Sequence, residues 1–189
     1  MRKKYQTRLF VAASLPNQTK KELIAIQRGI KDQSERCSIT KSENLHLTLA
    51  FIGEVGPRDF SKVKHFFSSL PDLKDTFKAI QPMLGSFNTR DGKLVWAGVK
   101  VEDQFHTFVK DLRSQLIDRG ISVDTKVWKP HITLSRRTQG LDLNQLRQEH
   151  AKTLNNFEIC RIDLFQSEFT PQGMRYTSLD HIKLGKNYN

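Results

Sequence analysis

The sequence predicts an α+β protein in which mainly antiparallel sheets carry helices on their outer faces. Two observations lead to this class. Segments of strand and helix pattern follow in the order strand, helix, strand, helix, strands, and then helix, strand, helix, strands, which suggests two similar halves. Asp91-Gly92 and Gly173 supply turn chemistry between neighbouring strand segments, which indicates antiparallel hairpins.

The first half of the chain predicts two strands that alternate with two helices. "RLFVAA" at 8–13 is an apolar strand segment, and Pro16 suits the first turn of the helix that follows. Leu23, Ile26 and Ile30 recur at spacings of three and four, which extends this helix to about Lys31. The other predicted elements are a loop from Asp32, a strand at 45–52, and a helix with the apolar stripe Phe60, Val63, Phe67 and Leu70 that stops at Pro71.

The second half predicts short strands, a helix, a strand, a shorter helix and two last strands. The longer helix places Phe105, Phe108, Leu112 and Leu116 on one face, and Gly120 suits its end. The predicted bounds are strands at 76–80, 83–87 and 93–101, a helix at 103–118, a strand at 130–135, a helix at about 142–154, and strands near 157–168 and 174–184. No linker divides the chain, so we expect a single two-lobed domain over residues 1–189.

The net charge of +11 favours anionic partners such as nucleic acid, although charge alone does not single out RNA. No apolar run approaches the roughly 20 residues that a membrane span requires. The apolar patch near the start is too short for a signal peptide, and a first strand explains it better. We therefore expect a cytoplasmic, monomeric protein without a membrane partner.

Two strand segments repeat one arrangement of polar residues, "NLHLTLAFIG" at 44–53 and "KPHITLSR" at 129–136. Successive side chains of a strand point to opposite faces. In the first segment, alternation separates a core face of Leu45, Leu47, Leu49 and Phe51 from a polar face of His46, Thr48 and Ala50. In the second, it separates Ile132 and Leu134 from His131, Thr133 and Ser135. Each segment thus carries an imidazole and a hydroxyl on the face away from the core.

A repeated His-x-Thr pair is suited to chemistry at phosphorus. One copy alone is more often a solvated or hydrogen-bonded pair than a catalytic one, and the second copy shifts this balance. If both strands line one cleft, a neutral imidazole can take a proton while a protonated one gives a proton. Each hydroxyl can hydrogen-bond a phosphate oxygen. The two motifs therefore predict in-line displacement at a phosphate held between a base and an acid.

Other catalytic classes fit the sequence less well. Neither motif carries Asp or Glu at its polar positions, as a metal-dependent hydrolase would want. The chain has no GxxxxGK[ST] loop for a nucleoside triphosphate and no GxSxG serine. We expect a site that works without metal or cofactor.

With these motifs the chain resembles the two-histidine phosphoesterases and, within them, the bacterial RNA 2',3'-cyclic phosphodiesterases, also called LigT-like or 2'-5' RNA ligase-like proteins. The shared motif is HxTx, here His46-Leu47-Thr48-Leu49 and His131-Ile132-Thr133-Leu134. "RLFVAASLP", "VWAGV" at 95–99 and "LFQSEFTPQGMRYTSL" at 164–179 match as well, so the resemblance covers nearly the whole chain. It implies two lobes related by an approximate twofold, with the motifs facing each other across a central cleft.

The resemblance also implies an activity, the metal-independent hydrolysis of the 2',3'-cyclic phosphate of RNA or a nucleoside to a 2'-phosphomonoester. By this analogy His46 donates a proton to the leaving 3' oxygen, and His131 is the base that activates water. Thr48 and Thr133 would hold the non-bridging phosphate oxygens. Because the two motifs are nearly symmetric, the residues alone do not distinguish acid from base. With a 5'-hydroxyl in place of water, the same site would perform the reverse reaction, 2'-5' RNA ligation.

Arg136 and Tyr176 are further candidates for binding substrate, because the resemblance places both near the phosphate cleft. Strict alternation puts Arg136 on the core face, so it reaches the phosphate only if the strand ends or bulges near Ser135. A solvated Arg136 is the alternative, and Arg137 could play the same part. For Tyr176, packing in the core or at the rim is the favoured role, with bordering the cleft as the alternative.

Two other functions stay open at the level of sequence. One is a nucleotide- or RNA-binding module that keeps the cleft and turns nothing over, although binding alone does not require two histidines. The other is a phosphodiesterase for another small cyclic phosphate or for a 2',5'-oligonucleotide.

Overall fold

The computed structural model describes residues 6–185, apart from the side chain of Gln81, and contains nine strands and four α-helices there. The strands are β1 (Thr7–Ser14), β2 (Arg36–Ile39), β3 (His46–Val55), β4 (Phe77–Thr89), β5 (Gly92–Val101), β6 (His131–Gln139), β7 (Phe157–Ile159), β8 (Arg161–Thr170) and β9 (Gly173–Lys183). The helices are α1 (Asn17–Gln33), α2 (Pro57–Ser68), α3 (Asp103–Asp118) and α4 (Leu143–Glu149), and a short 3₁₀ helix, Ser42–Asn44, precedes β3.

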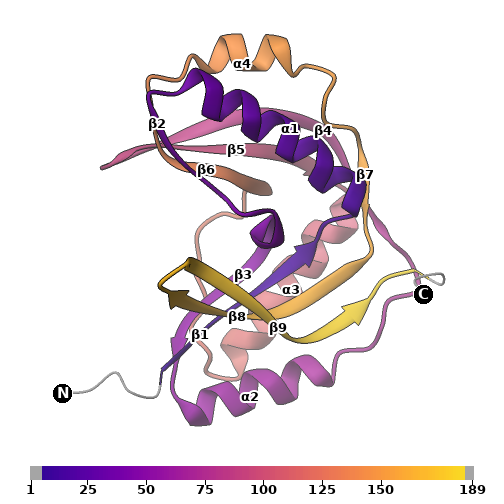
Figure 1. Cartoon of the computed structure of the whole chain (residues 1–189). Helices are drawn as coiled ribbons and strands as arrows, with labels where there is room; N and C mark the ends of the chain where they lie inside the picture. Colours follow the sequence, from indigo (N-terminus) through magenta and orange to yellow (C-terminus); the bar gives the residue numbers. More distant parts are fainter. Residues whose placement is uncertain (1–5, 186–189) are drawn as a thin grey trace.

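The strands form two sheets, one above the other in Figure 1. The lower sheet has the order β3-β1-β8-β9 and the upper sheet the order β2-β6-β5-β4-β7. All neighbouring strands within the two sheets are antiparallel. The predicted α+β class with mainly antiparallel sheets is therefore confirmed.

The two sheets repeat one strand order, which confirms the predicted pair of similar lobes. Strands β3, β1, β8 and β9 of the lower sheet correspond in order to β6, β5, β4 and β7 of the upper sheet, and β2 is added outside β6. The two His-x-Thr segments lie on β3 and β6, which are equivalent strands in this comparison. The sheets thus bring segments 85 positions apart in the chain to corresponding places.

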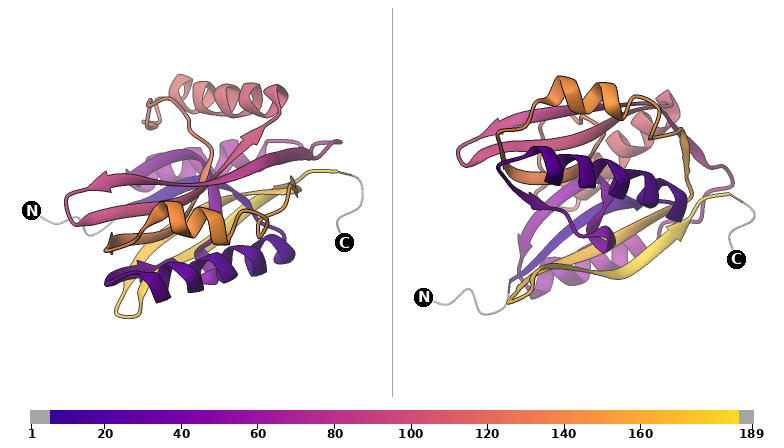
Figure 2. Two further views of the ribbon diagram at one scale, coloured as in Figure 1. Left: turned by 90° about the horizontal axis from the view of Figure 1, so that it is seen from above. Right: turned by 45° about the horizontal axis from the view of Figure 1, so that its top comes forward.

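Helices α1 and α3 each pack on the sheet opposite to that of the strand they follow. Helix α1 contacts β2, β6 and α4 of the upper layer, whereas α2 contacts β3 and β9 and α3 contacts β3 of the lower layer. Figure 2 shows α1 and α3 on opposite sides of the strands. Each sheet is therefore covered partly by a helix that follows a strand of the other sheet, since α1 follows β1 and α3 follows β5.

The apolar faces of the helices are mostly those that the sequence predicts. Leu23, Ile26 and Ile30 of α1 are fully buried, as their spacing requires. In α3 the buried face runs through Phe105, Val109, Leu112 and Leu116, while Phe108 packs only partly against the core. Gly120 follows the end of α3 with a φ of +74°, a left-handed conformation that favours glycine and ends a helix.

Several predicted boundaries differ from the structure. Strand β2 lies where a loop was expected, because a strand of four residues is too short to show a clear alternation. Segments 76–80 and 83–87 belong to one strand, β4, whose register shifts between Ile80 and Met83 around Pro82, which has no N–H to donate. Segment 157–168 divides at Cys160, where the chain passes from β7 of the upper sheet to β8 of the lower. Helix α4 ends at Glu149 rather than near 154.

Among the helices of residues 6–185, none combines the length and the apolar character that crossing a membrane would require.

Candidate active site between the two sheets

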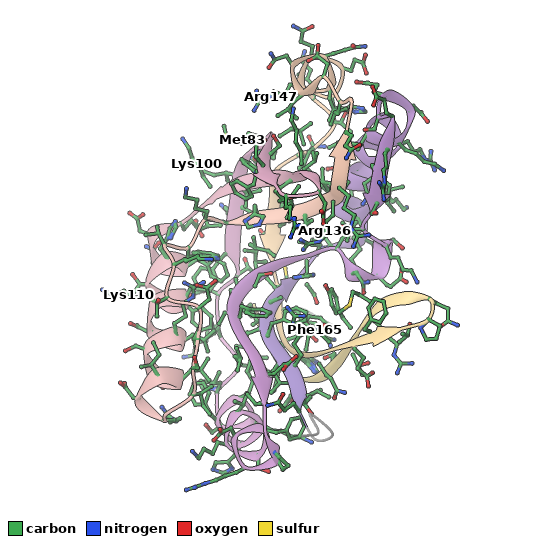
Figure 3. The ribbon with its side chains drawn as sticks, turned by 90° about the vertical axis from the view of Figure 1, so that its left-hand side faces the viewer. Met83, Lys100, Lys110, Arg136, Arg147 and Phe165 are labelled. Carbon is green, nitrogen blue, oxygen red and sulfur yellow. The ribbon has the colours of Figure 1, made fainter. Side chains whose placement is uncertain are left out.

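All six residues that the sequence selects line one cavity of about 360 Å³, namely His46, Thr48, His131, Thr133, Arg136 and Tyr176. The first two come from β3, the next three from β6 and the last from β9. Figure 3 shows Arg136 on the upper sheet and Phe165 on the lower sheet, on opposite sides of the space between them. The condition on which the catalytic interpretation depends, that both motifs border one cleft, is met.

Both histidines are oriented by the same backbone contact. His46 Nδ1 lies 2.7 Å from the carbonyl oxygen of Asn44, and His131 Nδ1 lies 2.7 Å from that of Lys129. A carbonyl oxygen only accepts, so each Nδ1 must carry a proton and donate it. The Nε2 atom of each ring is therefore the one free to exchange protons. His46 Nε2 in addition lies 3.0 Å from the hydroxyl of Thr48.

Burial sets the protonation state of His46. Its ring lies 4.9 Å from that of Phe10 and 5.3 Å from that of Tyr176, centroid to centroid. Desolvation among these rings lowers the pKa of His46 to about 4, the hydrogen bond to Asn44 opposes this, and the charges of Arg136 and His131 lower the pKa further. The His46 imidazole is therefore neutral at neutral pH.

Strand β3 contains a β-bulge inside its His-x-Thr segment. Against β1, Thr48 pairs with Ala12 and Ala50 with Val11, so Leu49 has no partner of its own. Leu49 and Ala50 are both buried, and Phe51 then lines the cavity. The prediction that Phe51 faces the core and Ala50 lies beside His46 is wrong, because the bulge inserts a residue that simple alternation does not count.

Strand β6 contains the same irregularity at the same place. Thr133 pairs with Trp96 and Ser135 with Val95, which leaves Leu134 without a partner on β5. Leu134 and Ser135 are both buried, and Arg136 returns to the face of His131. This is the bulge near Ser135 on which the prediction for Arg136 depended.

A side chain from a covering helix holds the backbone of each bulge. Arg113 of α3 donates through Nε to the Leu49 carbonyl at 2.8 Å. Gln27 of α1 donates through Nε2 to the Leu134 carbonyl at 2.9 Å, and the backbone N–H of Thr40 donates to the same oxygen. A bulge leaves ladder groups unpaired, and these donors satisfy them. The two helices thus fix the part of each strand that carries the site.

Tyr176 combines the two roles that the sequence left open. Its ring stands edge-on to His46 and lies 4.9 Å from the Phe10 ring, while its side chain also borders the cavity. Sequence reasoning missed Arg8, Phe10 and Asn44, which line the cavity as well. Arg8 and Phe10 share one face of β1 by alternation, and this pattern in "RLFVAA" was the available signal.

The cavity is suited to an anion. Its lining contains the cations Arg8 and Arg136, with the guanidinium of Arg8 5.0 Å from the centre of the Phe51 ring, and no Asp or Glu among the described residues. Within residues 6–185 no group of three or more His, Cys, Asp or Glu side chains is arranged to hold a metal ion. What the cavity does offer is two imidazoles, hydroxyls and guanidinium groups.

Comparisons with known proteins agree with this geometry. Residues 14–96 match the family model described as LigT like Phosphoesterase. The chain is 24% identical over 190 residues to the RNA 2',3'-cyclic phosphodiesterase of Methanothermobacter thermautotrophicus, covering 95% of this chain and 100% of that protein. It is 28% identical over 175 residues to the enzyme of the same name from Archaeoglobus fulgidus, covering 91% and 97%.

The fold comparison reaches the same group of proteins. A crystal structure of E. coli LigT in complex with NADP+ superposes with a TM-score of 0.72 at 22% identity, covering 96% of this chain and 99% of that one. The match to the family model includes β3 with the first HxTx motif and ends before β6, whereas the two relatives and the superposed structure each cover more than nine-tenths of the chain. The chain is therefore similar to the LigT-like phosphoesterases in part of its sequence and in its fold.

Proposed function

We propose that this phosphoesterase hydrolyses the 2',3'-cyclic phosphate at the end of RNA, or of a nucleoside, to a 2'-phosphomonoester. The single observation that carries the proposal is the convergence of His46 and His131, each with its threonine, on one cavity free of carboxylates among the described residues. The names of the relatives from M. thermautotrophicus and A. fulgidus support the same substrate.

The reaction needs one proton taken and one proton given. In the proposed mechanism, Nε2 of neutral His131 removes a proton from water as its oxygen attacks phosphorus. The bond to the 3' oxygen breaks on the opposite side, and His46 Nε2–H supplies the proton for this leaving oxygen. The hydroxyls of Thr48 and Thr133 donate hydrogen bonds to the non-bridging oxygens, and Arg136 offsets their charge.

For His46 to act as proton donor, binding of substrate must change His46 from the neutral to the protonated form. Burial lowers the pKa of His46 to about 4, so the ring is neutral in the protein without substrate. A cyclic phosphate brings a negative charge beside this ring, and an opposite charge favours the imidazolium. Binding of substrate should therefore be accompanied by uptake of a proton at His46 Nε2.

The proposal is tested by incubating the protein with a 2',3'-cyclic mononucleotide and with an oligonucleotide that ends in a 2',3'-cyclic phosphate, in the presence of EDTA. We expect both to give a 2'-phosphate, identified by chromatography against 2'- and 3'-phosphate standards. Exclusive formation of a 3'-phosphate would contradict the choice of leaving oxygen. Tight binding of both compounds without turnover would favour the non-catalytic binding module.

A further inference from the structure

An exposed apolar strip runs across the upper sheet beside the active site. It consists of Met83 and Phe87 on β4 and Leu94 and Trp96 on β5, and we call it the β4–β5 strip. Phe87 pairs with Leu94 in the ladder, so the two side chains share a face of the sheet. Met83 is 63% exposed and Phe87 is 36% exposed, although large apolar side chains usually avoid water.

Two glycines leave the space in which the indole of Trp96 lies against the sheet. A Cβ atom added to Gly85 would lie 2.2 Å from Trp96 Cη2, and one added to Gly98 would lie 2.6 Å from Cζ3. Any larger residue at either position would therefore push the ring away. Phe87 packs against the indole with the ring centroids 5.2 Å apart. The strip is thus a preformed aromatic surface and not a set of scattered side chains.

The strip is continuous with the catalytic cavity. Phe87 stands edge-on to the His131 ring at 5.5 Å, and Trp96 does so at 6.2 Å. Leu94 belongs to the strip and also lines the cavity. Figure 3 shows Met83 on the same upper sheet as Arg136. A chain attached to a phosphate in the cavity would meet this surface within a short distance of His131.

The chain segments that form the strip and the neighbouring strand β6 carry more basic than acidic residues, which favours a polyanion as partner. The segments 82–98 and 129–139 contain five basic residues and one acidic residue, Asp91. The basic residues are Arg90, Lys93, Lys129, Arg136 and Arg137. Exposed aromatic rings flanked by cations are the arrangement that binds single-stranded nucleic acid, because bases stack on the rings while cations neutralise the backbone.

We propose that the β4–β5 strip binds the nucleobases that precede the cyclic phosphate, so that the preferred substrate is a single-stranded RNA end of two or more nucleotides and not a cyclic mononucleotide. The inference rests on the proposed function for its phosphate, and it adds a second binding region to that site. A terminal cyclic phosphate lies between the histidines, and the strand that leads to it crosses Trp96, Phe87 and Met83. Stacking on aromatic faces tolerates any base, so the strip selects length and not sequence.

The first test compares two substrates with the same terminal base, a 2',3'-cyclic mononucleotide and a trinucleotide that ends in a 2',3'-cyclic phosphate. We expect the wild-type protein to have the higher kcat/KM for the trinucleotide. Phe87→Ala should lower the ratio of the two kcat/KM values about tenfold, the usual size of one base–aromatic stack. Effects on the chemical step cancel in this ratio, because both substrates present the same phosphate to His131.

Two further variants separate the strip from the rest of the surface. Met83→Ser changes an exposed side chain, so it should fold normally and should lower the ratio by a smaller factor. Phe169, 86% exposed in the β8–β9 hairpin of the lower sheet, offers a matched Phe→Ala control. A ratio that falls with Phe169→Ala and is unchanged with Phe87→Ala would overturn the proposal, because the RNA would then follow the lower sheet.

A binding measurement distinguishes failure of the strip from failure of the proposed activity. The probe is a 5'-labelled trinucleotide that already ends in a 2'-phosphate, and its Kd follows from fluorescence anisotropy. We expect Phe87→Ala to raise this Kd about tenfold whether or not the protein hydrolyses cyclic phosphates. If the wild-type protein hydrolysed no cyclic phosphate and Phe87→Ala still raised this Kd, the proposed function would be wrong and RNA binding by the β4–β5 strip would be supported.

Other results would contradict RNA binding by the strip while supporting the proposed activity. Normal hydrolysis with an unchanged ratio and an unchanged Kd in Phe87→Ala would show that the surface binds no RNA. The strip could also serve a second copy of this chain. If sedimentation showed a wild-type dimer that Phe87→Ala dissociates, with RNA binding unaltered, the strip would be a self-association surface and the proposal would be wrong.

Discussion

At the scale of residues, His46 and His131 occupy equivalent strand positions and differ in what surrounds them. Their Nδ1 atoms have the same backbone partner, two positions earlier in the chain. His46 alone is packed among Phe10, Phe165 and Tyr176. The sequence could identify both histidines and their threonines, because strand alternation is a local property. It could not distinguish the two rings, because the aromatic packing around His46 brings together three strands that are distant in sequence.

The low pKa of His46 can be observed directly. We expect the His46 imidazole of the free protein to titrate near pH 4 in nitrogen-15 NMR, with the signal assigned by comparison with His46→Asn. Addition of inorganic phosphate should move the titration to higher pH, because a bound anion favours the charged ring. A His46 pKa that is unchanged by saturating phosphate would contradict the proposed proton uptake.

The same pKa predicts how stability varies with pH. The unfolded chain takes up a proton at His46 near pH 6.5, whereas the native protein does so only near pH 4. The unfolded state therefore binds more protons between these values, and the free energy of unfolding falls as the pH is lowered from 6.5 toward 4. Urea unfolding of wild-type protein should show this loss, and His46→Asn should show less of it. Parallel curves for the two proteins would rule out His46 as the cause.

Replacement of either histidine should remove most of the activity, by about 10²- to 10⁴-fold in kcat, the usual span for general acid–base catalysis. A substrate whose leaving 3' oxygen is replaced by sulfur tells the two roles apart, because a thiolate leaves without a proton. We expect this substrate to restore activity to His46→Ala and not to His131→Ala. Rescue of His131→Ala alone would reverse the assignment of donor and base.

At the scale of elements, the two β-bulges decide which side chains reach the site. Alternation predicts the faces of His46, Thr48, His131 and Thr133, all of which line the cavity. It fails two residues after each threonine, at the buried Ala50 and Ser135, because a bulge is recognised by its pairing with a neighbouring strand and leaves no clear local mark. From the sequence, Arg136 could reach the phosphate only with a strand end or a bulge near Ser135, and this bulge is present in β6. The equivalent bulge in β3, before Phe51, was not predicted.

The helix side chains that hold the bulges should affect both stability and rate. Arg113→Met removes the donor to the Leu49 carbonyl while keeping an apolar side chain of similar length. A buried carbonyl that loses its partner costs about 1–3 kcal/mol, so we expect a loss of that order in urea unfolding. Release of the bulge should also lower kcat more than it changes KM, because Thr48 and Phe51 adjoin it.

The matched control is Lys110→Met, an exposed position on the same helix. It should leave both the stability and kcat close to wild type. If Arg113→Met lowered stability alone, with kcat unchanged, the guanidinium would hold the fold without positioning the site.

At the scale of the whole molecule, the exchange of helices joins the two sheets into one unit. The sequence shows that α1 and α3 each have one apolar face, and this part of the fold was predictable. The sequence does not show which sheet each apolar face covers, because an apolar stripe indicates that a helix packs on something and does not specify its packing partner. The repeated order of elements indicated two similar halves, whereas each sheet takes strands from both halves of the sequence and is covered partly by a helix that follows a strand of the other sheet.

A consequence is that the two lobes should unfold together. Differential scanning calorimetry should show one transition, with the calorimetric enthalpy equal to the van't Hoff enthalpy, as for a single cooperative domain. Two resolved transitions would mean that each sheet is stable without the helix that follows a strand of the other sheet, and the expectation of a single domain would then be wrong.

Under the proposed function, the bulges that place Phe51 and Arg136 in the cavity would also determine the direction in which a substrate lies. Two identical walls would accept a cyclic phosphate in either of two orientations, and one of them would present the wrong oxygen to the proton donor. At the position where the walls could be identical, one strand carries a benzene ring and the other a fixed positive charge. Under the proposed function, the two imidazoles would transfer the two protons, and this pair of unlike side chains, together with the burial of His46, would set the orientation of the substrate between them.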